Sequence, residues 1–267
     1  MGFDKDNGMK NTRIRDKPLK EAALFGFLVL VLMWLVYWAD YIFVFDFHSL
    51  GVLPKRMEGL KGIFFMPWVH AHDDIKHIIN NSPAIFMLAT LLFYSYRSIA
   101  FRVFIGSWLL SGLLLWIYAD DKGTYHIGMS AVIYSLASFL FISGFLRKYF
   151  PLQALSLLVV FLYGSMVWGI FPSHPRISWE GHLMGSVSGI FLAFIYRKKG
   201  PQPPKMQYEI EKELGIEPPD LEGMYLEKLA QEKAALESKE DQKGQQVTYH
   251  YIPNAKSEDD KNQASDL

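Results

Sequence analysis

Ser130 and His182 are the two residues whose chemistry stands out in this sequence. Ser130 follows Gly128 at the start of one long apolar run, and His182 opens another. A serine hydroxyl is a weak nucleophile until a neighbouring base takes its proton, and an imidazole can serve as that base. No Asp or Glu lies within the apolar runs from residue 78 onward, apart from Glu180 at a boundary. The residues therefore predict a two-member Ser–His dyad.

A second group of polar residues precedes another apolar run. His77 and Asn81 are four residues apart, so on a helix they share one face. Their N–H groups, with the backbone N–H of Ser130, could hold a developing oxyanion. We expect His70, Asp73 and Asp74, which lie in the preceding loop, to be solvated.

The elements that must position these residues are membrane helices. Hydrophobic residues make up 51% of the 267 residues, the formal net charge is zero and cysteine is absent. A hydrocarbon core of ~30 Å needs ~20 apolar residues in a helix. Six segments of roughly that length run over about residues 22–39, 78–94, 101–119, 127–146, 152–171 and 181–196. The fold class is therefore all-α, a bundle of six transmembrane helices.

The charges predict how the bundle lies in the membrane. Thirteen Lys and Arg residues flank the spans on the side of the N-terminus and six flank them on the other. This excess places both termini in the cytoplasm. We expect a cytoplasmic leader at 1–20, a membrane domain at 21–198 and a polar, largely disordered cytoplasmic tail at 199–267, helical in part over 221–239.

This orientation brings the reactive residues together. The second, fourth and sixth spans all begin at the outer face, so His77, Ser130 and His182 fall at similar depths. Gly181, Gly185 and Gly189 recur every four residues and create a groove where another helix can approach closely. We expect that groove to pack the sixth span against the fourth.

These motifs, over residues 20–198, resemble the rhomboid family of intramembrane serine proteases. Gly128-Met129-Ser130 matches the family's Gly-x-Ser, and Tyr134 matches an aromatic residue that packs on the catalytic histidine. The family's His-x4-His-x3-Asn pattern matches His72, His77 and Asn81, of which the last two help to bind the oxyanion. Ala131 departs from the pattern, because the family usually has a second glycine after the serine.

The resemblance implies an endopeptidase that cuts transmembrane proteins near the outer membrane face, with Ser130 as nucleophile and His182 as general base. The expected partners are transmembrane substrates and the lipid bilayer, with no nucleic acid, cofactor or metal. We expect a multi-pass protein of a bacterial plasma membrane.

Other functions stay open from the sequence. His70, His72, Asp73, Asp74 and His77 would suit a metal-dependent membrane hydrolase. An inactive relative that binds transmembrane helices is another alternative, which Ala131 keeps open although both dyad residues are retained. A transporter is disfavoured, because the spans hold no charged residue deep in the bundle.

Overall fold

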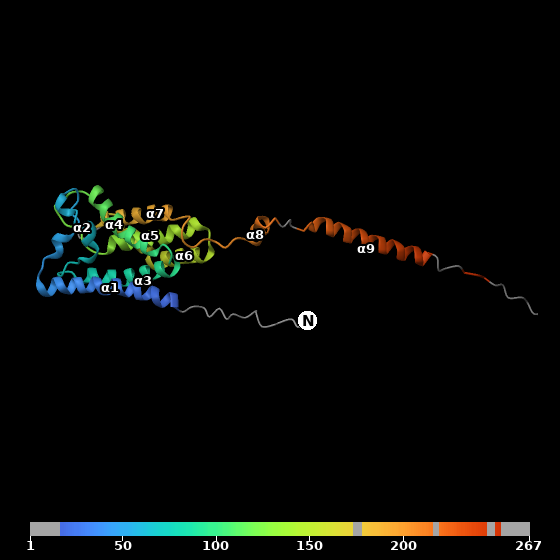
Figure 1. The fold of residues 1–267 in the computed structure, drawn as a ribbon, viewed down its shortest axis with the longest axis horizontal. Coiled ribbons are helices and arrows are strands. Elements are labelled where there is room, and N and C mark those ends of the chain that lie inside the picture. The colour runs from blue at the N-terminus through green and yellow to red at the C-terminus, as the bar shows by residue number, and fades with distance from the viewer. Residues whose placement is uncertain (1–16, 173–177, 216–218, 245–248, 252–267) are drawn as a thin grey trace, which may run out of the picture. The chain divides into compact units, whose positions relative to one another are not determined.

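The computed structural model describes residues 17–172, 178–215, 219–244 and 249–251. Within these ranges the chain forms helices and no β-strand, only one isolated β-bridge. Most of the predicted leader, the centre of the loop from 172 to 180 and the end of the tail lie outside the described residues. The chain divides into two compact units, residues 1–204 and 205–267 (Figure 1).

Five helices of the first unit are long and apolar enough to cross a bilayer. They are α1 (Lys17–Phe43), α3 (Ile75–Ser95), α4 (Ala100–Tyr118), α5 (Ser130–Arg147) and α6 (Phe150–Tyr163), the last extended by a 3-10 helix, η4 (Gly164–Ile170). The chain is therefore an integral membrane protein. The predicted sixth span corresponds to α7 (Trp179–Ile195), which has 17 residues, the lower end of the usual range.

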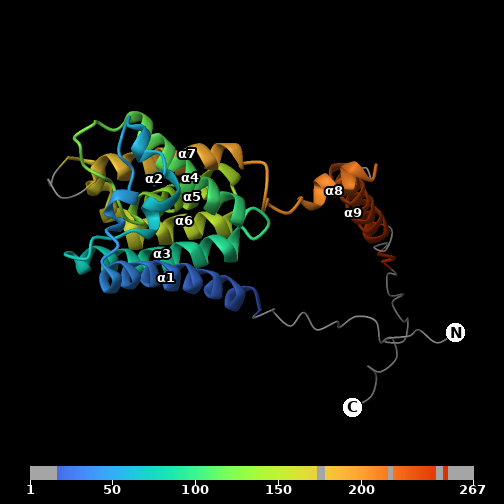
Figure 2. The ribbon, with the colours of Figure 1, turned by 60° about the vertical axis from the view of Figure 1, so that its left-hand side comes forward.

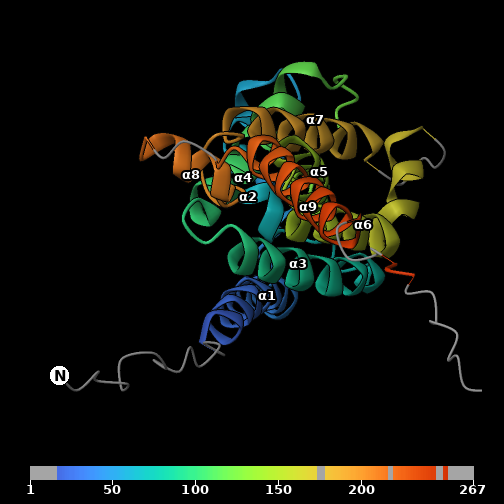
Figure 3. The same ribbon diagram turned by 90° about the vertical axis from the view of Figure 1, so that its right-hand side faces the viewer.

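Helix α5 is the centre of the bundle. About 61% of its apolar stretch is buried, compared with 22% for the stretch formed by α6 and the 3-10 helix η4 that follows it. It packs against α3, α4, α6 and most extensively against α7. Figure 2 shows α5 between α7 and α3, and Figure 3 shows α1 at the edge of the bundle beside α3. The helix that begins with Ser130 is therefore the most buried of the five spans.

Two glycines let α7 approach α5. A Cβ atom at Gly185 would lie 2.2 Å from the Ala131 carbonyl oxygen, and one at Gly189 would lie 2.0 Å from that of Ser135. The predicted glycine groove thus packs against α5 at these two positions. Gly181 differs, because a Cβ there would meet Ser178 and Leu115 instead.

The start of α5 is set by long-range backbone contacts. We expected the helical run to begin near residue 127, but His126 and Val52 exchange two backbone hydrogen bonds in a β-bridge. Gly128 then takes a φ of +103°, a value that L side chains rarely adopt. The helix therefore begins only at Ser130.

The segment between α1 and α3 packs on the bundle, as its apolar content predicted. It forms the 3-10 helices η1 (Phe47–Leu50), η2 (Met57–Gly59) and η3 (Met66–Trp68) and the short α2 (Gly62–Phe65). Val52, Met66 and Val69 are buried. Two tryptophan side chains of α4 hydrogen-bond to the segment. Trp108 Nε1 donates to the Phe64 carbonyl, and Trp116 Nε1 donates to the Arg56 carbonyl.

A buried arginine ties α5 to α7 at the opposite end of the bundle. Arg147 is 4% exposed, and its guanidinium donates to the carbonyl oxygens of Tyr196 at 2.6 Å and Lys199 at 2.7 Å. It also donates to the Ser143 hydroxyl and lies 5.0 Å from the Tyr96 ring centre. Carbonyls at a helix C-terminus have no intrahelical donors, so Arg147 satisfies the end of α7.

The second unit contains two helices, α8 (Gln207–Glu213) and α9 (Leu221–Gly244). Helix α9 covers the 221–239 stretch that was expected to be helical. The described side chains of α9 are almost all exposed.

The glycine contact predicts a large stability cost for a single methyl group. Gly189→Ala places a Cβ against backbone atoms of α5 that cannot rotate away, so we expect a loss of about 1–3 kcal/mol in the free energy of unfolding. Thermal unfolding in detergent micelles measures it. Gly164→Ala is the matched control, since its Cβ meets only Val160 at 3.6 Å. Equal stability of the two variants would contradict the close contact.

Candidate functional site

Ser130 is the first residue of α5 and is half-buried. The first N–H groups of a helix have no intrahelical acceptor, so those of Ser130 and Ala131 point out of the helix end. The helix dipole adds positive potential at this end. A negative charge that forms beside Ser130 would be favoured there.

His182 lies on α7 with its ring stacked on Tyr134 of α5, at 4.2 Å between ring centres and an interplanar angle of 10°. Its Nδ1 is 3.0 Å from the carbonyl oxygen of Gly169. A carbonyl only accepts, so Nδ1 carries the proton and a neutral His182 keeps its lone pair on Nε2. This is the tautomer that a general base needs.

The Tyr134 ring is itself fixed. Its hydroxyl donates to the Met166 carbonyl at 2.7 Å, and a Cβ at Gly169 would lie 2.1 Å from the same hydroxyl oxygen. Met166 and Gly169 both belong to η4. The 3-10 segment at the end of α6 therefore holds both the imidazole and the ring beneath it.

The α5–α7 register relates His182 to Ser130. Gly185 lies over Ala131 and Gly189 over Ser135, so the two helices run in the same direction. The same register places His182, three residues before Gly185, level with Gly128, three residues before Ala131. His182 therefore lies within about one helical turn of Ser130 along the helix axis. Within the described residues no hydrogen bond joins the two side chains. Such bonds are often loose in the absence of substrate and tighten when it binds.

His77 and Asn81 lie on α3, and both side chains approach Gly128, which lies two residues before Ser130. A Cβ at position 128 would be 2.6 Å from His77 Cε1 and 3.7 Å from Asn81 Nδ2. Glycine is therefore required at position 128 by its backbone conformation and by the His77 ring. The structure brings together three predicted residues here, His77, Asn81 and Gly128, and Gly128 lies two residues before Ser130.

His70, which we expected to be solvated, is the residue that organises this group. It is 1% exposed, so that expectation is wrong. Its Nδ1 lies 3.4 Å from the Trp68 carbonyl, and its Nε2 accepts the Met129 N–H at 3.4 Å. Nε2 is thus an acceptor, and the Asn81 atom 3.0 Å away must be the amide nitrogen Nδ2. One imidazole links the Asn81 side chain to the backbone directly before Ser130.

The environment of His70 keeps it neutral. Burial, and to a smaller extent the neighbouring His77, lower the pKa of His70 to about 3. The ring centres of the two histidines are 5.0 Å apart. His70 therefore remains an acceptor for Asn81 throughout the physiological pH range.

His72 does not join the others. Its Nδ1 lies 3.3 Å from Asp40 Oδ2 near the end of α1, and its side chain is 44% exposed. Asp40 is buried and also accepts the backbone N–H of Phe47. Asp73 and Asp74 are exposed, as expected. His72 thus ties α1 to the loop before α3.

Glu180 faces away from His182. It is 6% exposed, and its Oε1 accepts from Lys122 at 3.0 Å and from the Asp120 N–H at 3.4 Å. Oε2 lies 4.0 Å from His126 Nε2, and His126 Nδ1 is 2.6 Å from Ser178 Oγ. Burial lowers the pKa of His126, with a smaller opposing effect from Glu180. This cluster joins the start of α7 to the loop before α5.

The metal alternative requires three ligands at one point. Among the described residues, no group of three His, Asp or Glu side chains is placed to hold a metal ion. His70 and His72, two members of the candidate set, face different partners.

The comparison with protein families supports the resemblance. A model of the Rhomboid domain matches residues 58–199, more than half of the chain. The chain belongs to the rhomboid family. The match begins in the loop before α3 and ends after α7, so it contains every element that carries a candidate site residue of this rhomboid protein.

Curated relatives come from mycobacteria and are described only as uncharacterized proteins. One from Mycobacterium leprae (strain TN) is 28% identical over 207 residues, which cover 73% of this chain and 79% of the relative. One from Mycobacterium tuberculosis (strain H37Rv) is 31% identical over 153 residues, 54% of this chain. That alignment spans 62% of the relative, less than two thirds of its length.

The low pKa of His70 predicts a pH dependence of stability. The folded value of about 3 lies below the usual 6.5, so between these values the unfolded chain binds a proton that the folded chain does not. The free energy of unfolding should fall as the pH drops through this window, by up to about 1.4 kcal/mol per pH unit from this group. His70→Gln, which keeps an acceptor, should reduce that slope.

Histidine NMR provides a direct check. Ring signals that disappear in the His70→Gln variant should not titrate between pH 7 and pH 5. A midpoint above pH 5 for those signals would contradict the buried neutral state.

Proposed function

We propose that this protein is an intramembrane serine endopeptidase. The observation that carries the proposal is the arrangement of His182: its Nδ1 is bound to the Gly169 carbonyl, its ring is stacked on Tyr134, and its Nε2 is left as a base within about a turn of Ser130. Membership of the rhomboid family supports the same activity.

In the proposed reaction, Ser130 Oγ attacks the carbonyl carbon of a substrate peptide bond while His182 Nε2 takes the hydroxyl proton. The tetrahedral oxyanion is held by His77, Asn81 and the Ser130 N–H. His182 then returns the proton to the leaving amine as the C–N bond breaks. Water hydrolyses the acyl-enzyme by the same steps and releases Ser130.

A backbone carbonyl takes the place that an acid holds in a catalytic triad. The Gly169 oxygen fixes the tautomer and orientation of His182, as a carboxylate would. It carries no full charge, so it stabilises the imidazolium less than a carboxylate does. Stacking on Tyr134 adds a further restraint on the ring.

The substrate class follows from the position of the site. Ser130 lies at one end of a membrane-spanning helix, so the scissile bond belongs near the end of a transmembrane segment. A helix hides its peptide bonds, and the substrate must unwind locally before Ser130 can reach one. With α7 as the sixth span and both termini in the cytoplasm, this end faces the outside of a bacterial plasma membrane. The reaction uses no metal or cofactor.

Active-site labelling tests the nucleophile. A fluorophosphonate should label the detergent-solubilised full chain on Ser130, and Ser130→Ala and His182→Ala should each abolish labelling. Ser98→Ala and Ser165→Ala, at two exposed serines, serve as controls for nonspecific reaction with other serines. Labelling that survives Ser130→Ala would remove Ser130 from the mechanism.

Two further measurements, transmembrane-peptide binding and treatment with a chelator, separate the alternatives. A folded chain that binds transmembrane peptides and never reacts would be the inactive relative. Activity lost with a chelator and restored by zinc would identify a metal-dependent hydrolase.

The oxyanion role of Asn81 predicts a selective kinetic defect. Asn81→Ala should lower kcat by about 10²–10³-fold and leave KM nearly unchanged, because the lost hydrogen bond forms only with the oxyanion. Initial rates on a reconstituted transmembrane substrate give both constants. The neighbouring Asn80 is exposed, so Asn80→Ala is a matched control with near wild-type rates. Equal defects in the two variants would exclude this role.

A further inference from the structure

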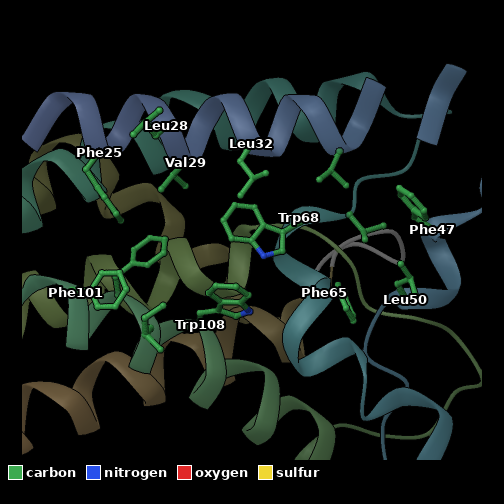
Figure 4. A pocket seen from close by; sticks show the side chains of 14 residues that line it. Phe25, Leu28, Val29, Leu32, Phe47, Leu50, Phe65, Trp68, Phe101 and Trp108 are labelled. Atoms are coloured by element: carbon green, nitrogen blue, oxygen red, sulfur yellow. The ribbon is translucent and has the colours of Figure 1, made fainter. Parts of the chain in front are cut away.

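An apolar cavity lies between α1 and α4, away from Ser130. Its volume is about 650 Å³, and the fourteen residues that line it are all apolar or aromatic. Figure 4 shows Leu28, Val29 and Leu32 of α1 on one side, Phe101 and Trp108 of α4 on the other, and Trp68 between them.

The cavity offers almost nothing to a polar ligand. The indole N–H of Trp108 already donates to the Phe64 carbonyl, at 3.0 Å. Water in such a space would lack the two to four polar partners that it needs. An extended peptide would leave its backbone N–H and C=O groups unsatisfied at membrane depth, which is too costly. The occupant must therefore be a hydrocarbon.

The dimensions fit one leaflet of a bilayer. The lining residues of α1 run from Phe25 to Val36, which is about 16 Å along the helix at ~1.5 Å per residue. This is roughly half of the ~30 Å hydrocarbon core. Phe47 and Leu50 line the far end, where the segment between α1 and α3 meets the cavity (Figure 4). A membrane-crossing helix would need the full thickness.

The cavity is continuous with the surface that faces lipid. Leu24 and Leu35 of α1 are 56% and 61% exposed, and Phe101, itself part of the lining, is 62% exposed. A phospholipid beside α1 and α4 can therefore insert a chain into the cavity without crossing a polar boundary.

We propose that this cavity binds one acyl chain of a membrane phospholipid, inserted between α1 and α4. The chain fills the gap beneath the segment between α1 and α3. It packs against Trp68 and Val69, which directly precede the buried His70. The bound acyl chain thus packs against the segment that carries His70, which accepts a hydrogen bond from Asn81.

Photo-crosslinking tests the proposal on the full chain. The protein is reconstituted in phosphatidylethanolamine–phosphatidylglycerol vesicles that contain a phospholipid with a diazirine in its acyl chain. After irradiation, adducts are mapped by mass spectrometry. We expect adducts on Trp68 and Trp108, measured relative to Phe161, which is 85% exposed on α6 and contacts bulk lipid.

Cavity-filling variants supply the contrast. Leu32→Trp should reduce the Trp108 adducts at least five-fold relative to Phe161, and Leu28→Trp provides a second filler if the first fails to fold. Leu35→Trp is the matched control, because Leu35 lies on the same helix but outside the lining, and it should leave the adducts unchanged. No adducts on Trp68 and Trp108 in the wild type, or equal adducts in the filled and control variants, would overturn the proposal. Displacement by a transmembrane peptide would assign the cavity to a protein ligand instead.

Discussion

The close approach of the α5 and α7 backbones is the contact on which the candidate site depends. Helices gain little from hydrophobic association inside a bilayer, so close van der Waals packing has to hold them together. Gly185 and Gly189 meet carbonyl groups of α5 directly, and this contact fixes the register that puts His182 near Ser130. The three atoms nearest to a Cβ at Gly185 are the O, C and Cα atoms of Ala131, so the backbone of residue 131 and not its methyl group limits this approach.

Neutral groups organise the rest of the site. Gly169 orients the proposed base through a carbonyl, and His70 orients Asn81 through an uncharged imidazole. In a low-dielectric interior a fully satisfied neutral network avoids the desolvation cost of a buried carboxylate. The acid nearest to His182 in the sequence, Glu180, is engaged with Lys122 and His126. The groups that orient the proposed base and Asn81 are therefore uncharged, and uncharged groups cost less to desolvate than charged ones.

Apolar run length predicted the five spans that the structure shows, because a helix in a membrane needs a fixed number of apolar residues; the sixth predicted span coincides with the 17-residue α7. Run length failed at the start of α5, where the pairing of His126 with Val52 is a contact between distant segments. The residue spacing was reliable for His77 and Asn81, which both lie on α3. His72 precedes the start of α3 at Ile75, and residue spacing does not define where a side chain of that loop lies. For His70, the apolar run Met66-Pro67-Trp68-Val69 just before it was the available signal.

Arg147 and His70 secure the opposite ends of α5 by different chemistry. The guanidinium of Arg147 keeps its charge at any pH that a cell reaches, so its bonds to Tyr196 and Lys199 are indifferent to acid. The end near Ser130 relies on the uncharged ring of His70, whose Nε2 accepts from Asn81 and from the Met129 N–H and would lose both bonds on protonation. Acidification would thus loosen the contact of α5 with α3 at the reactive end first, while the arginine end stays joined to α7.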